Sequence, residues 1–277
     1  MLYFRTKLTN KLREADMKLT ISLAQIDIAY GNPDENFAKI EPLVKQAAAA
    51  GADVVVFPEM WNTGYDLSRF DKIADENGER TRQLLSELAK KYQLIVHGGS
   101  VAIKHDGAFY NTTYIFGRDG KLLTQYEKVH LFGLMHEDEF LAAGHEEDHF
   151  QIKGVDATSV ICYDIRFPEW LRTLSLDNSR IIFVPAEWPT SRIPQWRRLL
   201  AARAIENQSF VVAVNRVGSD PDNPFGGHSG VYNPMGDEIL TLGDQPQLKT
   251  ITIDTTETDE VRGFMPVFED RRPELYR

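Results

Sequence analysis

DVVVFPEMW, residues 53–61, resembles RIIFVPAEWP, residues 180–189, down to the proline, glutamate and tryptophan. Each stretch begins as a short, wholly apolar run, which is typical of a strand buried on both faces. The elements around the two stretches also follow one order. The sequence therefore predicts a chain built from two similar halves.

Each half alternates strand-like and helix-like segments. In the first half, strands are predicted at 19–28, 53–61, 94–103 and 109–123, and helices at 35–51 and 80–92. In the second half, strands are predicted at 158–165, 180–189, 210–218 and 227–240, and helices at 168–176 and 195–208. Strands that alternate with helices indicate a layered α/β fold. We expect two β-α-β-α-β-β halves that pack sheet on sheet with the helices outside.

The composition excludes several classes of protein. The net charge of -10 argues against nucleic acid or an anionic membrane as the main partner. No apolar run approaches the ~20 residues that a membrane helix needs. The single cysteine cannot form an internal disulfide, which favours a reducing, cytoplasmic location. Residues 1–16 are basic and weakly patterned, so we expect an N-terminal extension outside a single domain at 17–277.

That cysteine, Cys162, lies in VICYDIRFPEW at residues 160–170, between a predicted strand and a predicted helix. The start of a helix lowers the pKa of a thiol and favours a nucleophile. The alternative is a small buried hydrophobic residue, and the position alone leaves both open. Gln25 occupies the matching place in the first half, so packing does not require cysteine there.

Two further residues have the chemistry that a thiol nucleophile needs. Glu59 follows a buried strand and is a candidate base, with a surface acid as the alternative. Lys128 lies among apolar residues in YEKVHLF; its alternative is a lysine that extends to solvent. The acid-rich connection at 124–157 is either functional or a solvated loop. There is no H-E-x-x-H motif and no cysteine pair, so we expect no metal and no cofactor.

FPEMW, YEKVHLF and VICYDIRFPEW, in that order, resemble motifs of the nitrilase, or carbon-nitrogen hydrolase, superfamily. The spacings of 69 residues from Glu59 to Lys128 and 34 from Lys128 to Cys162 also agree (162 − 128). LLAARAIENQ, GHSGVYNPMGDEI and MPVFEDRRPELY extend the resemblance over residues 18–277.

The resemblance implies a four-layer α-β-β-α sandwich and a thiol mechanism. Cys162 would attack the carbon of a C–N bond, with Glu59 as the general base. Lys128 and the backbone N–H of Tyr163 would stabilise the oxyanion. A thioester would form as ammonia leaves. The family often uses a second glutamate after the lysine; Glu137 fits best, and Glu139 competes with it.

The sequence after the cysteine, Cys-Tyr-Asp-Ile-Arg-Phe-Pro-Glu, resembles amidases that act on small carboxylated amides. These include the omega-amidases, which hydrolyse 2-oxoglutaramate and 2-oxosuccinamate. A deaminated-glutathione amidase, an N-carbamoyl amino acid hydrolase and a binding protein that kept only the fold are the alternatives. The family resemblance also implies a homodimer or larger homo-oligomer, with the tail at 263–277 in the contact.

A carboxylated substrate calls for a cation, and arginine holds a carboxylate through two hydrogen bonds. Arg166 and Arg192 are the candidates, although Arg166 is equally suited to pair with Asp164 and stabilise the turn. Four further residues are candidates to line the pocket, with ordinary packing as the alternative for each: Trp61, Tyr65, Trp188 and His228.

Overall fold

The computed structural model describes residues 17–276, and the predicted extension at 1–16 lies outside them. The first half contains β1 (Lys18–Gln25), α2 (Pro33–Ala49), β2 (Val54–Val56), α3 (Phe70–Ile73), β3 (Asp75–Glu76), α4 (Glu79–Tyr92), β4 (Ile95–His97), β5 (Val101–His105), β6 (Ala108–Phe116) and β7 (Leu122–Glu127). The connection contains α5 (Glu137–Phe140).

The second half contains β8 (Phe150–Ile152), β9 (Val155–Ser159), α6 (Pro168–Ser175), β10 (Ile181–Ala186), α7 (Ile193–Asn207), β11 (Phe210–Asn215), β12 (Val217–Ser219), β13 (Pro224–Gly226), β14 (Gly230–Tyr232), β15 (Glu238–Thr241), β16 (Gln247–Asp254) and α8 (Thr256–Phe264). Short 3₁₀ turns lie at η1 (Leu67–Arg69), η2 (Gly133–Met135), η3 (Cys162–Arg166), η4 (Thr190–Arg192) and η5 (Pro273–Leu275). Within residues 17–276, no helix is both long and apolar enough to cross a bilayer.

The two halves have the same strand topology, which confirms the predicted duplication. Strands β1, β2 and β4 are parallel neighbours, and β6 follows antiparallel. Strands β9, β10 and β11 repeat this arrangement, with β14 as the antiparallel strand. The last strand, β16, returns to pair antiparallel with β1 of the first half.

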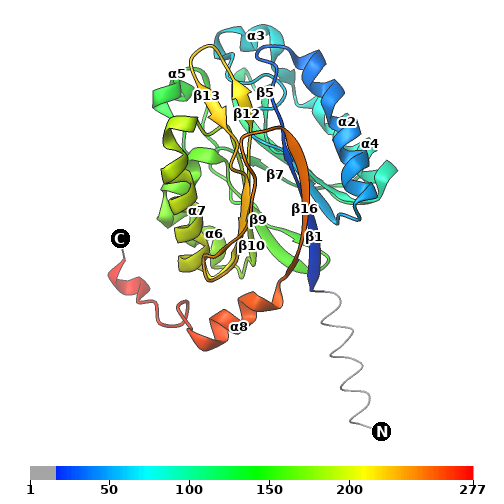
Figure 1. Cartoon of the computed structure of the whole chain (residues 1–277). Coiled ribbons are helices and arrows are strands. Elements are labelled where there is room, and N and C mark those ends of the chain that lie inside the picture. Colours follow the sequence, from blue (N-terminus) through cyan, green and yellow to red (C-terminus); the bar gives the residue numbers. More distant parts are fainter. Residues whose placement is uncertain (1–16, 277) are drawn as a thin grey trace.

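The two sheets pack face to face with helices outside, as predicted. Val54 and Val56 of β2 face the apolar layer between the sheets, which also holds Ile181 and Phe183 of β10. Val55, on the opposite face of β2, packs in the layer beneath α2 and α4. Helices α6 and α7 cover the outer face of the second sheet. Figure 1 shows α2 and α4 on one side of the sheets and α6 and α7 on the other.

Several predicted strands are shorter or divided in the structure. The segment predicted at 53–61 is a strand only at Val54–Val56, that at 109–123 contains most of β6 and the start of β7, and that at 227–240 contains β14 and most of β15. Two further differences lie at 94–103 and 158–165. The strand predicted at 94–103 is interrupted after His97, because Gly99 has a φ of 59°. The strand predicted at 158–165 ends at Ser159. The chain then turns, and Cys162 begins η3 with a φ of 45°.

Asp148, just before β8, is a buried acid whose pKa is raised to about 7 because burial disfavours its charge. Its Oδ1 accepts hydrogen bonds from Ser159 N and Thr158 Oγ1, whereas its Oδ2 has no partner within residues 17–276. The native state therefore binds this proton more tightly than the unfolded chain, where the pKa of aspartate is about 3.9. The contribution of Asp148 to stability should decrease as the pH rises from about 4 to 7.

We predict that Asp148→Asn removes this pH dependence, because asparagine cannot ionise. The variant should match the wild type near pH 4 and become more stable than it by a few kcal/mol at pH 8. Urea unfolding of both proteins across this pH range measures the difference. A free-energy difference that does not change with pH would contradict the assignment.

Candidate active site

Glu59 lies three residues beyond β2 and is fully buried. Its Oε1 accepts hydrogen bonds from Tyr65 Oη (2.7 Å), Asn111 Nδ2 (2.8 Å) and Lys128 Nζ (2.8 Å). Its Oε2 accepts the backbone N–H of Glu187 at 2.8 Å. Burial alone would raise the pKa of Glu59, but Lys128 and the hydrogen bonds outweigh it and lower that pKa. Glu59 is therefore an ionised carboxylate at neutral pH.

Lys128 follows β7, and its side chain is buried between two carboxylates. Its Nζ lies 2.8 Å from Glu59 Oε1 and 2.6 Å from Glu137 Oε1. Burial lowers the pKa of a lysine, but here the two carboxylates more than compensate, so the pKa rises above its ordinary value. Lys128 thus carries a fixed positive charge and cannot act as a base near neutral pH.

Glu137 and Glu139 differ completely in their surroundings. Glu137, the first residue of α5, is fully buried, and its Oε2 accepts the N–H of Phe132 at 2.6 Å. Burial raises its pKa, and Lys128 opposes this only in part. Glu139 is exposed and pairs with His136 at 2.8 Å. Of the two candidates, Glu137 is the one that contacts Lys128. The exposure of Glu139 shows that part of the connection at 124–157 is a solvated acidic loop.

Cys162 is 7% exposed, on the turn between β9 and α6. The expected lowering of its pKa is wrong: burial and the neighbouring Glu59 raise the thiol pKa well above its usual value, and Lys128 opposes them only in part. The sequence suggested the opposite because only the local helix start was considered. The thiol is therefore protonated near neutral pH, and a thiol in this state needs a base before it can act as a nucleophile. The backbone N–H of Tyr163 lies in the first turn of η3, where such donors lack helical partners.

Asp164 connects the turn that carries Cys162 to the segment around Lys128. The sequence did not predict this role. Its Oδ2 accepts Ile161 N (2.9 Å) and Tyr126 Oη (2.8 Å). Its Oδ1 accepts both N and Nδ1 of His130, at 2.9 and 2.8 Å. Tyr126 and His130 flank Lys128 by two residues on either side, so Asp164 fixes the lysine relative to Cys162. The only sequence signal was an acid two residues after the cysteine.

Arg166 does not pair with Asp164, which corrects that alternative. Its guanidinium lies 5.0 Å from the ring centroid of Trp188 and 6.0 Å from that of Tyr163. The guanidinium of Arg192 lies 5.2 Å from the ring of Phe132. The ring centroids of Phe132 and Tyr163 are 4.6 Å apart. The indole N–H of Trp188 donates to the backbone oxygen of Arg192. Two arginines and three aromatic rings thus form one group. Within residues 17–276, neither arginine has a carboxylate in salt-bridge range.

The other predicted pocket residues have different surroundings. Tyr65 belongs to the charged cluster, since its hydroxyl donates to Glu59 and lies 2.5 Å from Glu137 Oε1. Trp61 is a core residue that packs on Phe37. His228 bonds the backbone of its own turn at Gly226, and no hydrogen bond joins its side chain to the catalytic candidates within the described part of the chain.

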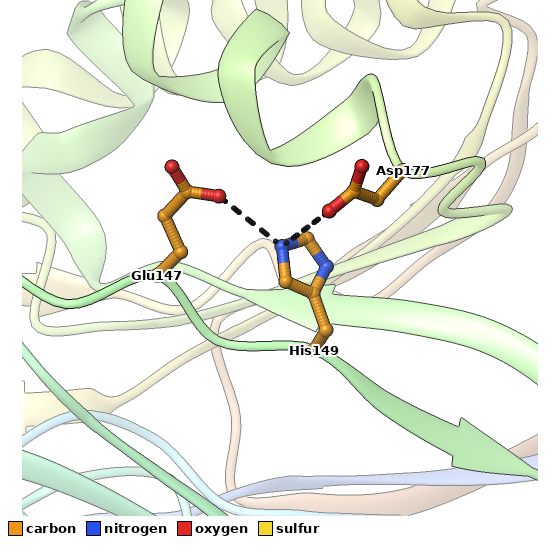
Figure 2. A group of neighbouring side chains, drawn as sticks. All are labelled: Glu147, His149 and Asp177. Atoms are coloured by element: carbon orange, nitrogen blue, oxygen red, sulfur yellow. Dashed lines mark hydrogen bonds and ion pairs between the residues drawn. The ribbon is translucent and has the colours of Figure 1, made fainter.

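One group of metal-ligand side chains lies elsewhere on the surface: Glu147, His149 and Asp177. Figure 2 shows both carboxylates directed at the same ring nitrogen of His149, at 3.4 and 3.5 Å. All three residues are exposed, and these distances are those of side-chain ion pairs. The arrangement gives no support for a metal at the cysteine.

The comparisons with known proteins agree with this geometry. The sequence model of the carbon-nitrogen hydrolase family matches residues 20–262. The chain belongs to the carbon-nitrogen hydrolase family. It is 45% identical over 260 residues to the 2-oxoglutaramate amidase of Bacillus subtilis (strain 168), covering 94% of this chain and 100% of that one. It is 31% identical over 268 residues to omega-amidase NIT2 of Danio rerio, covering 94% of this chain and 96% of that one.

The family's fold is also that of this chain. The crystal structure of XC1258 from Xanthomonas campestris, a carbon-nitrogen hydrolase superfamily protein, matches with a TM-score of 0.87 and 30% identity. The match covers 92% of this chain and 97% of that one. The predicted α-β-β-α sandwich is thereby confirmed. The chain is a hydrolase of amide C–N bonds in the omega-amidase-like branch of the family, as its motifs predicted.

We predict that Asp164→Asn lowers both kcat and stability, because an amide cannot accept all the hydrogen bonds that the carboxylate accepts. The loss of charged hydrogen bonds in a buried site should cost about 3 kcal/mol of unfolding free energy. Amide hydrolysis should fall at least about tenfold, since Lys128 is no longer held relative to Cys162. Asp138→Asn, at an exposed acid in the connection at 124–157, is the control. Normal kcat in Asp164→Asn would refute the positioning role.

Proposed function

We propose that the chain is an omega-amidase that hydrolyses 2-oxoglutaramate or 2-oxosuccinamate through a thioester on Cys162. The observation that carries the mechanism is the charge state of the buried cluster. It combines an ionised Glu59, a charged Lys128 and a protonated thiol. The 45% identity to a 2-oxoglutaramate amidase and the two arginines near Trp188 support the substrate.

In the first half-reaction, Glu59 removes the thiol proton as the sulfur of Cys162 attacks the amide carbon. The carbonyl oxygen becomes an oxyanion that Lys128 Nζ and the Tyr163 N–H stabilise. Protonated Glu59 then donates its proton to the nitrogen. The C–N bond breaks, ammonia leaves, and the acyl group remains on sulfur as a thioester.

In the second half-reaction, Glu59 acts again as the base. It removes a proton from a water molecule, whose oxygen attacks the thioester carbon, and the same donors stabilise the second oxyanion. Collapse of this intermediate breaks the C–S bond. The thiolate regains its proton from Glu59, and the product leaves as a carboxylic acid that ionises in water.

Glu137 keeps Lys128 charged and fixed in this scheme. If Glu59 were the only carboxylate beside Lys128, the ammonium group would lose its anionic partner whenever Glu59 accepts a proton. With Glu137 at 2.6 Å, Lys128 retains an anionic partner throughout the cycle. Its ammonium group therefore remains available to the oxyanion when Glu59 is protonated.

The carboxylate and 2-oxo group of the substrate bind in the group of Arg166, Arg192 and Trp188. Both guanidiniums lie on aromatic faces, which leaves their N–H edges for a planar anion. In this arrangement the negative end of the substrate lies near the Tyr163 ring, which Arg166 contacts, and the Tyr163 N–H is the proposed donor to the reacting carbonyl. The cluster around Lys128 already holds two carboxylates and would repel the carboxylate of the substrate.

The proposal extends to the setting of the enzyme. A single reduced cysteine as the nucleophile favours a cytoplasmic location, where thiols stay reduced. We expect residues 17–277 to act as one domain and to form a homodimer or larger homo-oligomer. The exposed apolar residues Leu176, Phe264, Met265 and Leu275, in and near the C-terminal tail, support such a contact. Sedimentation of a monomer at micromolar concentration would exclude it.

We predict that the purified protein releases ammonia from 2-oxoglutaramate and that Cys162→Ala abolishes this activity. A coupled ammonia assay across 2-oxo amides, amino-acid amides, deaminated glutathione, N-carbamoyl amino acids and nitriles ranks the substrates by kcat/KM. The 2-oxo amides should rank first. Faster turnover of deaminated glutathione or an N-carbamoyl amino acid would show that this compound is the substrate, and the proposed mechanism would still hold. No turnover of any compound would favour a binding protein.

We also predict that Arg166→Gln and Arg192→Gln raise KM for 2-oxoglutaramate, because each removes a cation from the carboxylate. The loss of one charged hydrogen-bonding group corresponds to about 10- to 100-fold in kcat/KM. An uncharged aliphatic amide of similar length is the control substrate, and its kcat/KM should change little. An equal loss for both substrates would show that the arginines only support the fold.

A further inference from the structure

The segment His97–Ser100 holds the loop that carries Glu59. The backbone of Ser100 donates to Pro58 O at 3.0 Å and accepts from Trp61 N at 3.1 Å, and its Oγ accepts from Met60 N at 3.0 Å. The contact is so close that a Cβ on Gly99 would lie 2.1 Å from Pro58 O. The position of Glu59 is therefore set by this turn as well as by β2.

The side chain of His97 joins this turn to the strand that leads to Cys162. His97 is the last residue of β4 in the first sheet, and its Nε2 lies 2.9 Å from Ser159 Oγ on β9 of the second sheet. Ser159 precedes Cys162 by three residues. Both side chains are fully buried, and Phe183 packs against the imidazole with ring centroids 5.1 Å apart.

The hydrogen bonds define how the imidazole is protonated. The N–H of Gly99 donates to His97 Nδ1 at 3.2 Å, so Nδ1 is the acceptor and Nε2 carries the proton toward Ser159. Burial also lowers the pKa of His97 to about 3, so the ring is neutral over the working pH range. One neutral imidazole therefore bonds the turn at His97–Ser100, which holds the loop of Glu59, and also bonds β9, the strand that leads to Cys162.

We propose that His97, through Ser159, is a positioning residue that fixes the distance between the base Glu59 and the nucleophile Cys162. The inference rests on the roles proposed above for these two residues. An apolar pair would fill the same space between the sheets without burying two polar groups. The polar pair instead allows one arrangement of the two sheets beneath the active site, because any slip leaves a buried donor or acceptor without a partner.

The test compares His97→Leu, His97→Gln, Ser159→Ala and the double variant His97→Leu/Ser159→Ala in the full chain. Ser22→Ala is the matched control, because Ser22 is an equally buried strand hydroxyl whose partner, Thr250, lies in the same sheet. The readouts are kcat and KM for the best amide substrate, the rate of Cys162 alkylation by iodoacetamide at neutral pH, and urea unfolding.

We expect His97→Leu and Ser159→Ala each to lower kcat about 10- to 100-fold, with KM changed less than about threefold. The double variant should lose no more than the worse single variant, because both remove one interaction. His97→Gln, which retains an N–H donor, should recover part of kcat. Alkylation should become slower in the leucine and alanine variants, because Glu59 is then displaced from the thiol whose proton it removes as the sulfur attacks. Ser22→Ala should leave kcat and alkylation unchanged.

Three results would overturn the proposal: unchanged kcat in the single variants, additive losses in the double variant, or a loss of kcat in Ser22→Ala equal to that in Ser159→Ala. If the wild type hydrolyses none of the amides, the proposed function fails. The alkylation rates then still decide whether His97 positions Cys162, because they need no substrate.

Discussion

The active site depends on one buried cation, Lys128, held between the carboxylates of Glu59 and Glu137. Buried charges are stable only when they are paired, and removing one partner leaves an uncompensated charge. Two carboxylates around one ammonium group leave an excess negative charge next to Cys162. This charge raises the pKa of the thiol, and in the proposed mechanism Glu59 is the group that removes the thiol proton. The same excess keeps Lys128 charged, as its proposed role at the oxyanion requires.

The duplicated fold brings these groups together from different halves. Glu59 follows β2 and Lys128 follows β7, both strands of the first sheet, whereas Cys162 follows β9 of the second sheet. When Glu59 is aligned with Glu187 of the second half, the strand registers align Gln25 with Cys162. Gln25 bonds Ser229 and the backbone of Gly243 instead of facing a site. Of the two equivalent strand ends, the one in the second half carries the proposed nucleophile, and Asp164 fixes it to the segment around Lys128.

Much of this could be predicted from the sequence, because strands buried on both faces and ordered motifs are local signals. The repeat predicts the layers, and the motifs select Glu59, Lys128 and Cys162 as the candidate site. Spacing favours Glu137 over Glu139 only slightly, whereas burial and the contact with Lys128 separate them clearly. The direction of the Cys162 pKa was wrong because its acidic neighbours are distant in sequence. Gly99 broke a predicted strand because it must approach the backbone of Pro58, a contact without any local pattern.

The most direct test of the account is the thiol pKa of Cys162 in the wild type and in Glu59→Gln. The chain has a single cysteine, so the ultraviolet absorbance of the thiolate, after subtraction of Cys162→Ala, reports this group alone. The account predicts a wild-type pKa above that of free cysteine, about 8.5. It also predicts a lower pKa in Glu59→Gln, where Lys128 acts on the thiol without the opposing carboxylate. A wild-type pKa below that of free cysteine, unchanged in Glu59→Gln, would contradict it.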